Sequence, residues 1–201
     1  MSSRKTSAAT SGGAPGAKRP PGSLAPGRPA PTRIKIISMG SGGCGKSCLI
    51  KRFCEERFVS KYIATIGVDY GVKPVQVDGA EVRVNFWDLS GHAEFFEVRN
   101  EFYKDAQGCV LVFDVCSRES FEECEAWLQE CSKFGANLRE MPVILCGNKA
   151  DKRRVVSEEE ARQFASSRGM SYFDVSASSG LNVQEVFLEL FGMVVRRTAT
   201  S

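Results

Sequence analysis

The chain has 201 residues, of which 42% are hydrophobic and 25% charged, as in ordinary globular proteins. Its net charge of only +3 gives little reason to expect a nucleic-acid partner. No apolar run approaches the roughly 18 residues that a membrane-spanning helix needs. The eight cysteines are scattered without a CxxC pair, which favours free thiols over a disulfide framework or a zinc module. The only histidine is His92, so any site that needs two imidazoles is excluded.

Residues 1–31 differ in composition from the rest of the chain. They contain six of the eight prolines and five Lys or Arg, but no acidic residue. Such a segment buries too little apolar surface to offset the entropy lost on ordering, so we expect a disordered basic tail. The alternative interpretations are a weak contact with an acidic surface and an organelle presequence. Residues 32–201 carry 22 basic and 24 acidic side chains and are therefore slightly acidic.

From residue 33 onward, stretches typical of strands alternate with stretches typical of helices. Asp78-Gly79 is a hairpin signal between two strands, and Ser157 with Glu160 three residues later forms a capping box at the start of a helix. In chain order the predicted elements are a strand at 33–39, a helix at 45–54, strands at 68–77, 81–88 and 108–115, a helix at 120–134, a strand at 142–147, a helix at 158–167, a strand at 171–175 and a helix at 182–197.

This alternation predicts a mostly parallel sheet with helices on both faces and a ligand site past the carboxyl ends of the strands. The first strand leads into a loop that reads G-x-x-x-x-G-K-S, whose glycines let backbone N–H groups turn toward phosphate oxygens. We expect Lys46 to bridge the β- and γ-phosphates and Ser47 to bind Mg²⁺. The loop predicts a site for a nucleoside triphosphate. Its members are Gly40, Ser41, Gly42, Gly43, Cys44, Gly45, Lys46 and Ser47.

Two later segments address the base. Asp151 of the sequence Asn148-Lys149-Ala150-Asp151 can accept two hydrogen bonds from guanine, whereas adenine lacks that pair of donors. Asn148 and Lys149 would brace the loop and cover the ring. A backbone N–H in the turn after the last strand could reach guanine O6, and that turn consists of Ser176, Ala177 and Ser178. Guanine is favoured, and an ATP-dependent P-loop kinase or ATPase is an alternative.

A third segment faces the phosphates. Asp88 ends a predicted strand and could hold Mg²⁺ through water, and Gly91 could bring its N–H to the γ-phosphate.

The order and spacing of these motifs over residues 33–197 resemble those of Ras-superfamily small GTPases, nearest the Rab branch. Residues 33–72 and 91–108 are most similar to Rab-like GTPases of the J-domain type. The resemblance implies one P-loop G domain at 32–197 and a short tail at 198–201. It implies a mostly parallel six-stranded sheet with one antiparallel strand and five flanking helices. It also implies GTP or GDP and Mg²⁺ as ligands, slow hydrolysis of GTP, and a monomer.

The resemblance implies further roles for individual residues. Phe58 should stack on the guanine, and Thr65 should bind Mg²⁺ when the γ-phosphate is present. Gly91 should begin the second switch. Effector, exchange and activating proteins should bind the switches and an aromatic triad, although plain core packing would also explain those aromatics. The remaining implied site residues are Tyr62 in the first switch, Cys48 after the phosphate loop, and the triad Tyr70, Trp87 and Phe102.

The chain departs from the family pattern at several points. His92 stands where a water-orienting Gln is usual, so it either assists hydrolysis or slows it. Leu89-Ser90 replaces the common Thr-Ala. The His-Pro-Asp motif of a J domain and the cysteines of C-terminal prenylation are missing, and residue 2 is Ser. We therefore expect no stable lipid anchor, and a protein of the cytoplasm or nucleus that reaches membranes only through partners.

Besides an ATP-dependent kinase or ATPase, two functions of a guanine-nucleotide site remain open. One is a GTP-binding molecular switch with a low intrinsic rate of hydrolysis, in Rab-like signalling or trafficking. The other is a GTP-bound scaffold that barely hydrolyses its nucleotide and recruits partners.

Overall fold

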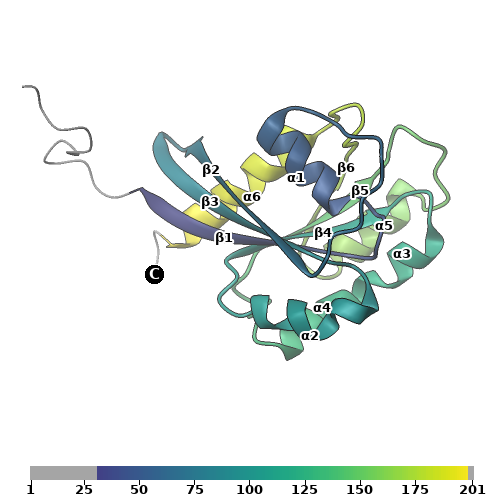
Figure 1. The fold of residues 1–201 in the computed structure, drawn as a ribbon, viewed down its shortest axis with the longest axis horizontal. Coiled ribbons are helices and arrows are strands. Elements are labelled where there is room, and N and C mark those ends of the chain that lie inside the picture. The colour runs from purple at the N-terminus through teal and green to yellow at the C-terminus, as the bar shows by residue number, and fades with distance from the viewer. Residues whose placement is uncertain (1–30, 199–201) are drawn as a thin grey trace, which may run out of the picture. The chain divides into compact units, whose positions relative to one another are not determined.

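The computed structural model describes residues 31–198 (Figure 1). Of the predicted tails at 1–31 and 198–201, all residues but Pro31 and Thr198 lie outside the described residues, so a disordered basic tail stays a prediction, and Thr198 belongs to the last helix. The elements of the described part are β1 (Thr32–Met39), α1 (Lys46–Glu55), β2 (Val68–Val77), β3 (Ala80–Leu89), η1 (Ala93–Phe95), α2 (Phe96–Arg99), η2 (Asn100–Phe102), β4 (Gly108–Asp114), α3 (Arg118–Glu122), α4 (Cys124–Lys133), β5 (Val143–Asn148), α5 (Glu158–Ser166), β6 (Ser171–Asp174) and α6 (Val183–Thr198).

The strands form one six-stranded sheet in the order β2-β3-β1-β4-β5-β6. β2 pairs with β3 in antiparallel fashion through the turn at Asp78-Gly79, and the other neighbouring pairs are parallel. Glu123 alone separates α3 from α4, and if these two are counted as one helix, five helices flank the sheet within residues 31–198. The predicted α/β fold is therefore confirmed.

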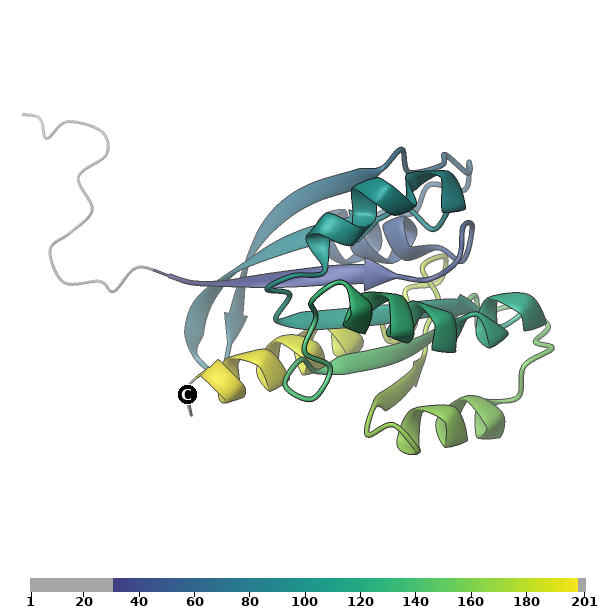
Figure 2. The same ribbon diagram turned by 90° about the horizontal axis from the view of Figure 1, so that it is seen from below.

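Each face of the sheet has its own hydrophobic core. Ile34 and Ile36 of β1 face α1 and α6, whereas Ile37 and Met39 face α3, α4 and α5. Alternate residues of β4 divide in the same way, because successive side chains of a strand point to opposite faces. α1 and α6 lie together on one side of the sheet in both ribbon views (Figures 1 and 2). A strand between two cores must be apolar on both faces, which explains the continuous apolar runs.

Two helix starts follow from their caps. Ser157 accepts a hydrogen bond from Glu160 N at 3.2 Å, which confirms the predicted N-cap of α5. The Glu160 carboxylate pairs with Arg118 of α3. The predicted helix at 120–134 begins earlier, at Arg118, because Ser117 caps it by accepting from Ser120 N. It is also divided at Glu123 into α3 and α4.

The parallel strands bring their carboxyl ends to one edge of the sheet. There β1 ends at Met39, β3 at Leu89, β4 at Asp114 and β5 at Asn148, and the predicted phosphate and base segments follow these ends. In the part of the chain that the structure describes, no helix is long and apolar enough to cross a membrane.

Candidate nucleotide-binding site

The glycine-rich loop between β1 and α1 can be built only with glycine at key positions. Gly40 has a φ of 134°, and a Cβ there would lie 2.0 Å from the Val112 carbonyl oxygen. Gly45 has a φ of 98°, and its Cβ would lie 2.2 Å from Asn148 Nδ2. Gly45 is also the N-cap of α1 and has no side chain that could occupy the amides of the first turn. The positive end of α1 therefore opens directly onto the loop.

The side chains of this loop have distinct environments. Lys46 is buried, and its ammonium donates to the carbonyl oxygens of Gly40 at 2.7 Å and Ser41 at 3.1 Å. The Ser41 hydroxyl donates to the Glu123 carboxylate, which connects the loop to the turn between α3 and α4. Cys44 packs in the core, where burial raises the pKa of its thiol. The loop thus offers backbone amides and one positive charge to an anion.

The three predicted magnesium ligands come together from three segments. The hydroxyl oxygens of Ser47 and Thr65 lie 2.8 Å apart. Asp88 is buried, and its carboxylate accepts a hydrogen bond from the Ser38 hydroxyl at 2.6 Å. Burial raises the pKa of Asp88, and hydrogen bonds from Ser38 and Ser47 act against that rise. Hydroxyl and carboxylate oxygens are the hard ligands that Mg²⁺ prefers, so this group fits the ion.

Asn148 joins the base segment to the phosphate loop. Its buried amide donates to the Cys44 carbonyl oxygen at 2.8 Å and accepts from Ala177 N at 3.2 Å. Lys149 lies beside it and donates to the Gly43 carbonyl oxygen at 2.9 Å and to the Asp114 carboxylate at 2.5 Å. The loops after β1, β5 and β6 are therefore bound to one another.

Asp151 is exposed in the loop that follows β5. Its Oδ1 accepts a hydrogen bond from the buried hydroxyl of Ser176 at 2.5 Å. The Ser178 carbonyl oxygen accepts from Arg52 of α1 at 3.3 Å. The two base segments, separated by about 25 residues along the chain, thus face each other across Asp151 and Ser176.

The segment after α1 is exposed. Phe58 is 40% exposed, and its stacking on a base stays a prediction. Tyr62 is 62% exposed, and its hydroxyl lies 2.9 Å from His92 Nε2. Cys48 is half-buried on α1 with its side chain packed against the core, and its contact with a nucleotide stays a prediction.

The segment after β3 packs closely against the phosphate loop. A Cβ on Gly91 would lie 2.4 Å from Gly42 N, and a Cβ on Gly42 would lie 2.8 Å from His92 Cε1. Arg99 fixes the backbone of this segment by donating to the His92 carbonyl oxygen at 2.8 Å. Its buried guanidinium is held in turn by the Glu130 carboxylate of α4 through bonds of 2.7 and 2.8 Å.

The three predicted effector aromatics form a continuous row. The ring centroids of Tyr70 and Trp87 are 4.6 Å apart, and those of Trp87 and Phe102 are 4.9 Å apart. Trp87 and Phe102 pack against the core, while Tyr70 is 51% exposed and donates to Asn85 Oδ1 at 2.9 Å. Core packing and an exposed surface are therefore both present in this row.

Four residues of the site were not predicted from the sequence. Ser38 and Asp114 position Asp88 and Lys149, and Arg99 with Glu130 anchors the segment at His92. The sequence contains a weak indication for two of these residues. Ser38 lies within an apolar strand and Asp114 at the end of one, and polar residues at such positions suggest a role at the site to which the strands lead.

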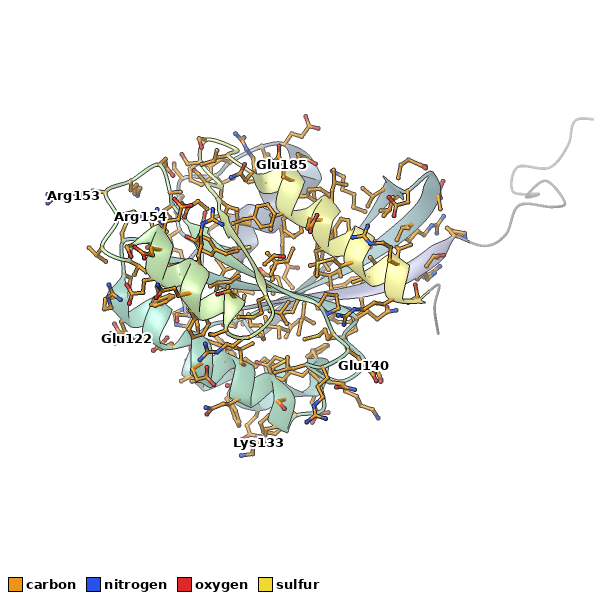
Figure 3. All side chains as sticks on the ribbon, turned by 180° about the vertical axis from the view of Figure 1, so that it is seen from behind. Glu122, Lys133, Glu140, Arg153, Arg154 and Glu185 are labelled. Carbon is orange, nitrogen blue, oxygen red and sulfur yellow. The ribbon has the colours of Figure 1, made fainter. Side chains whose placement is uncertain are left out.

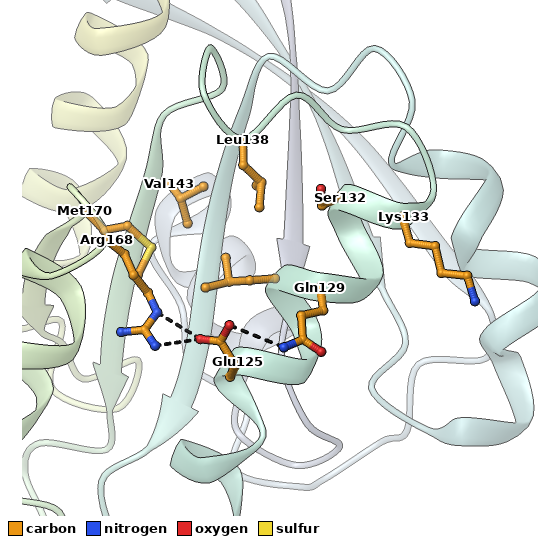
Figure 4. Close-up of a pocket in the computed structure, with 9 residues that line it drawn as sticks. Glu125, Gln129, Ser132, Lys133, Leu138, Val143, Arg168 and Met170 are labelled. Carbon is orange, nitrogen blue, oxygen red and sulfur yellow. Dashed lines mark hydrogen bonds and ion pairs between the residues drawn. The ribbon is translucent and has the colours of Figure 1, made fainter.

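Two other features of the molecule lie away from the carboxyl ends of the strands: peripheral charged side chains and a cavity. Charged side chains such as Glu122, Arg153 and Glu185 lie at the periphery (Figure 3). A cavity of about 520 Å³ lies between α4 and β5, where the ion pair of Glu125 and Arg168 borders apolar side chains (Figure 4). Its lining includes Val143 at the start of β5, so it lies toward the opposite edge of the sheet from Asn148.

Comparison with known proteins identifies the family. A model of the Ras family matches residues 35–196. The chain belongs to the Ras family. DnaJ homolog subfamily C member 27 of Danio rerio is 52% identical over 167 residues, which cover 81% of this chain and 61% of that relative. The protein of that name from Homo sapiens is 50% identical over 169 residues, which cover 81% of this chain and 62% of the relative.

These matches confirm the resemblance to Rab-like small GTPases, and the chain spans about three fifths of the length of these curated relatives. Membership in the Ras family implies that the domain binds GTP and GDP, and it supports a GTP-binding switch. The interpretation as an ATP-dependent kinase or ATPase is thereby set aside.

Replacing Asn148 by Ala tests the connection between the loops. The change removes two buried hydrogen bonds and leaves their backbone partners unsatisfied, so the free energy of unfolding should fall by about 2–4 kcal/mol. Denaturant unfolding without added nucleotide measures this loss. The control is Asn137→Ala, which removes an exposed amide whose oxygen accepts from Arg139 N at 3.2 Å, with an expected loss of at most about 1 kcal/mol. Equal losses in the two variants would contradict the account.

Proposed function

We propose that this protein is a guanine-nucleotide switch that binds GTP or GDP with Mg²⁺ and hydrolyses GTP slowly. The observation that carries the proposal is the double connection of Asn148 and Lys149 to the phosphate loop. It sets a guanine-selecting carboxylate, that of Asp151, at a fixed place relative to the loop that takes the phosphates. Membership in the Ras family supports the same function.

The residues of the site divide the chemical work between them. Lys46 neutralises charge on the β- and γ-phosphates, and the backbone of the loop orients them. Ser47 and Thr65 would hold Mg²⁺ directly and Asp88 through water, and the ion, when bound, neutralises further phosphate charge. The Gly91 N–H would bind the γ-phosphate. Water then attacks the γ-phosphorus in line with the leaving oxygen, and the protein needs no covalent step.

The two switch segments respond to the γ-phosphate. Residues 55–64 are exposed, so few internal contacts oppose their movement. Thr65 and Gly91 would be held while the γ-phosphate is present and released after its loss. Effector, exchange and activating proteins would read this change at the switches and at the row of Tyr70, Trp87 and Phe102. Ile63 and Ile66, on either side of Thr65 in the first switch, are 72% and 82% exposed and would offer apolar surface to such partners.

We further propose that the protein acts as a monomer in the cytoplasm or nucleus, in Rab-like signalling or trafficking, and reaches membranes through its partners. The second candidate function is a GTP-bound scaffold that barely hydrolyses. One contact favours it: His92 Nε2 is engaged by Tyr62, and that nitrogen is therefore not available to orient a water.

Replacing Asp151 by Asn tests the base assignment. An amide matches the C2 carbonyl of xanthine but not the two donors of guanine, so GTP should bind about 100-fold more weakly and xanthosine triphosphate correspondingly better. Competition against a fluorescent nucleotide measures both affinities. Asp78→Asn in the turn between β2 and β3 is the control and should change neither. An unchanged preference in Asp151→Asn would count against the assignment.

Replacing His92 by Gln distinguishes slow hydrolysis from assisted hydrolysis. If histidine is the cause of the low rate, single-turnover phosphate release should rise about tenfold, which is less than the roughly 100-fold or more of a positioned acid or base, because Gln only orients the water. The measurement uses protein loaded with GTP and Mg²⁺, at equal loading of both forms. A fall in the rate would instead make His92 the residue that assists the attacking water.

A further inference from the structure

A side-chain contact bridges the two switch segments above the phosphate loop. The Tyr62 hydroxyl oxygen lies 2.9 Å from His92 Nε2, although the two residues are 30 positions apart. This is an ordinary distance for a hydrogen bond. The contact joins the exposed segment after α1 to the segment that follows β3.

His92 is the fixed half of this contact. Its carbonyl oxygen accepts a hydrogen bond from Arg99, which is only 5% exposed. The Arg99 guanidinium donates in turn to the carboxylate of Glu130 on α4. The imidazole lies against the phosphate loop, since Cε1, Nε2 and Nδ1 would be 2.8, 3.0 and 3.2 Å from a Cβ placed on Gly42. Backbone and ring of His92 are therefore both held by neighbouring elements.

Tyr62 is the movable half. It lies within residues 55–64, all of which are exposed, and is itself 62% exposed. Further along this segment Thr65 lies 2.8 Å from Ser47, and Ser90 N donates to the Gly67 carbonyl oxygen at 2.9 Å. The hydroxyl of Tyr62 thus attaches the middle of an exposed loop to a rigid support.

We propose that Tyr62 and His92 form a latch that closes the first switch over the phosphate loop and slows the release of bound nucleotide. Tyr62 is then a positioning residue: it decides which nitrogen of His92 faces the nucleotide. The Nε2 atom of imidazole has one hydrogen-bonding direction in the ring plane. While Tyr62 occupies it, only Nδ1 remains for other groups. The latch rests on the proposed function, because its effect is on a bound guanine nucleotide.

The first test measures the dissociation of a fluorescent GDP analogue from the full chain with Mg²⁺. Tyr62→Phe removes only the hydroxyl and should accelerate dissociation about three- to tenfold, the effect of losing one hydrogen bond. Tyr70→Phe is the matched control, because its hydroxyl bonds to Asn85 and not to the site. His92→Ala should accelerate dissociation similarly, and adding Tyr62→Phe to it should give no further increase.

The second test observes the imidazole directly and needs no nucleotide. The chain has a single histidine, so nuclear magnetic resonance shows one set of ring signals, all from His92. Tyr62→Phe should shift the ring nitrogen signals, and Tyr70→Phe should leave them unchanged.

The two tests separate the latch from the function beneath it. Ring signals that do not respond to Tyr62→Phe would overturn the latch, as would acceleration of equal size in the His92→Ala background. Shifted ring signals with unaltered dissociation would overturn its effect on release. If the unaltered protein bound no guanine nucleotide, the proposed function would fail, and the ring signals would still decide whether Tyr62 holds His92.

Discussion

The site depends on the two hydrogen bonds that the side-chain amide of Asn148 makes. A buried amide needs partners for its donor and acceptor atoms, and Asn148 finds them in the loops after β1 and β6. The same amide explains a neighbouring glycine, because a side chain on Gly45 would collide with Nδ2. Lys149 adds a second connection through Gly43. One side chain at the end of β5 thus holds phosphate-binding and base-selecting loops at a fixed separation.

The half of the site that meets the γ-phosphate is built differently. The segment after α1 is exposed along residues 55–64 and is attached through hydroxyl contacts at Tyr62 and Thr65. On the other side, Arg99 and Glu130 bind the His92 carbonyl oxygen to α4, so that segment has one fixed point beside Gly91. A nucleotide switch requires firmly connected base-binding loops and weakly attached segments at the γ-phosphate, since only the latter should change with the nucleotide.

Local patterns were sufficient to predict the sheet and the loops that bear motifs. The apolar runs of β4 and β5, the turn at Asp78-Gly79 and the cap at Ser157 each depend on nearby residues alone. The contacts that position the site depend on distant residues. Ser38 and Asp88 are 50 positions apart, and Lys149 and Asp114 are 35 apart. No local periodicity encodes such pairs. The start of α3 at Arg118 was missed because the cap at Ser117 precedes the apolar pattern.

Single-turnover hydrolysis distinguishes a slow GTPase from a GTP-bound scaffold. The protein is loaded with γ-labelled GTP and Mg²⁺, and bound label and released phosphate are followed together. Phosphate should be released steadily at or below the order of 10⁻⁴ s⁻¹, the intrinsic rate of this class, and Lys46→Ala should abolish this release. Label that stays bound and intact for days would contradict slow hydrolysis and identify a GTP-bound scaffold, and label that never binds would contradict the switch itself.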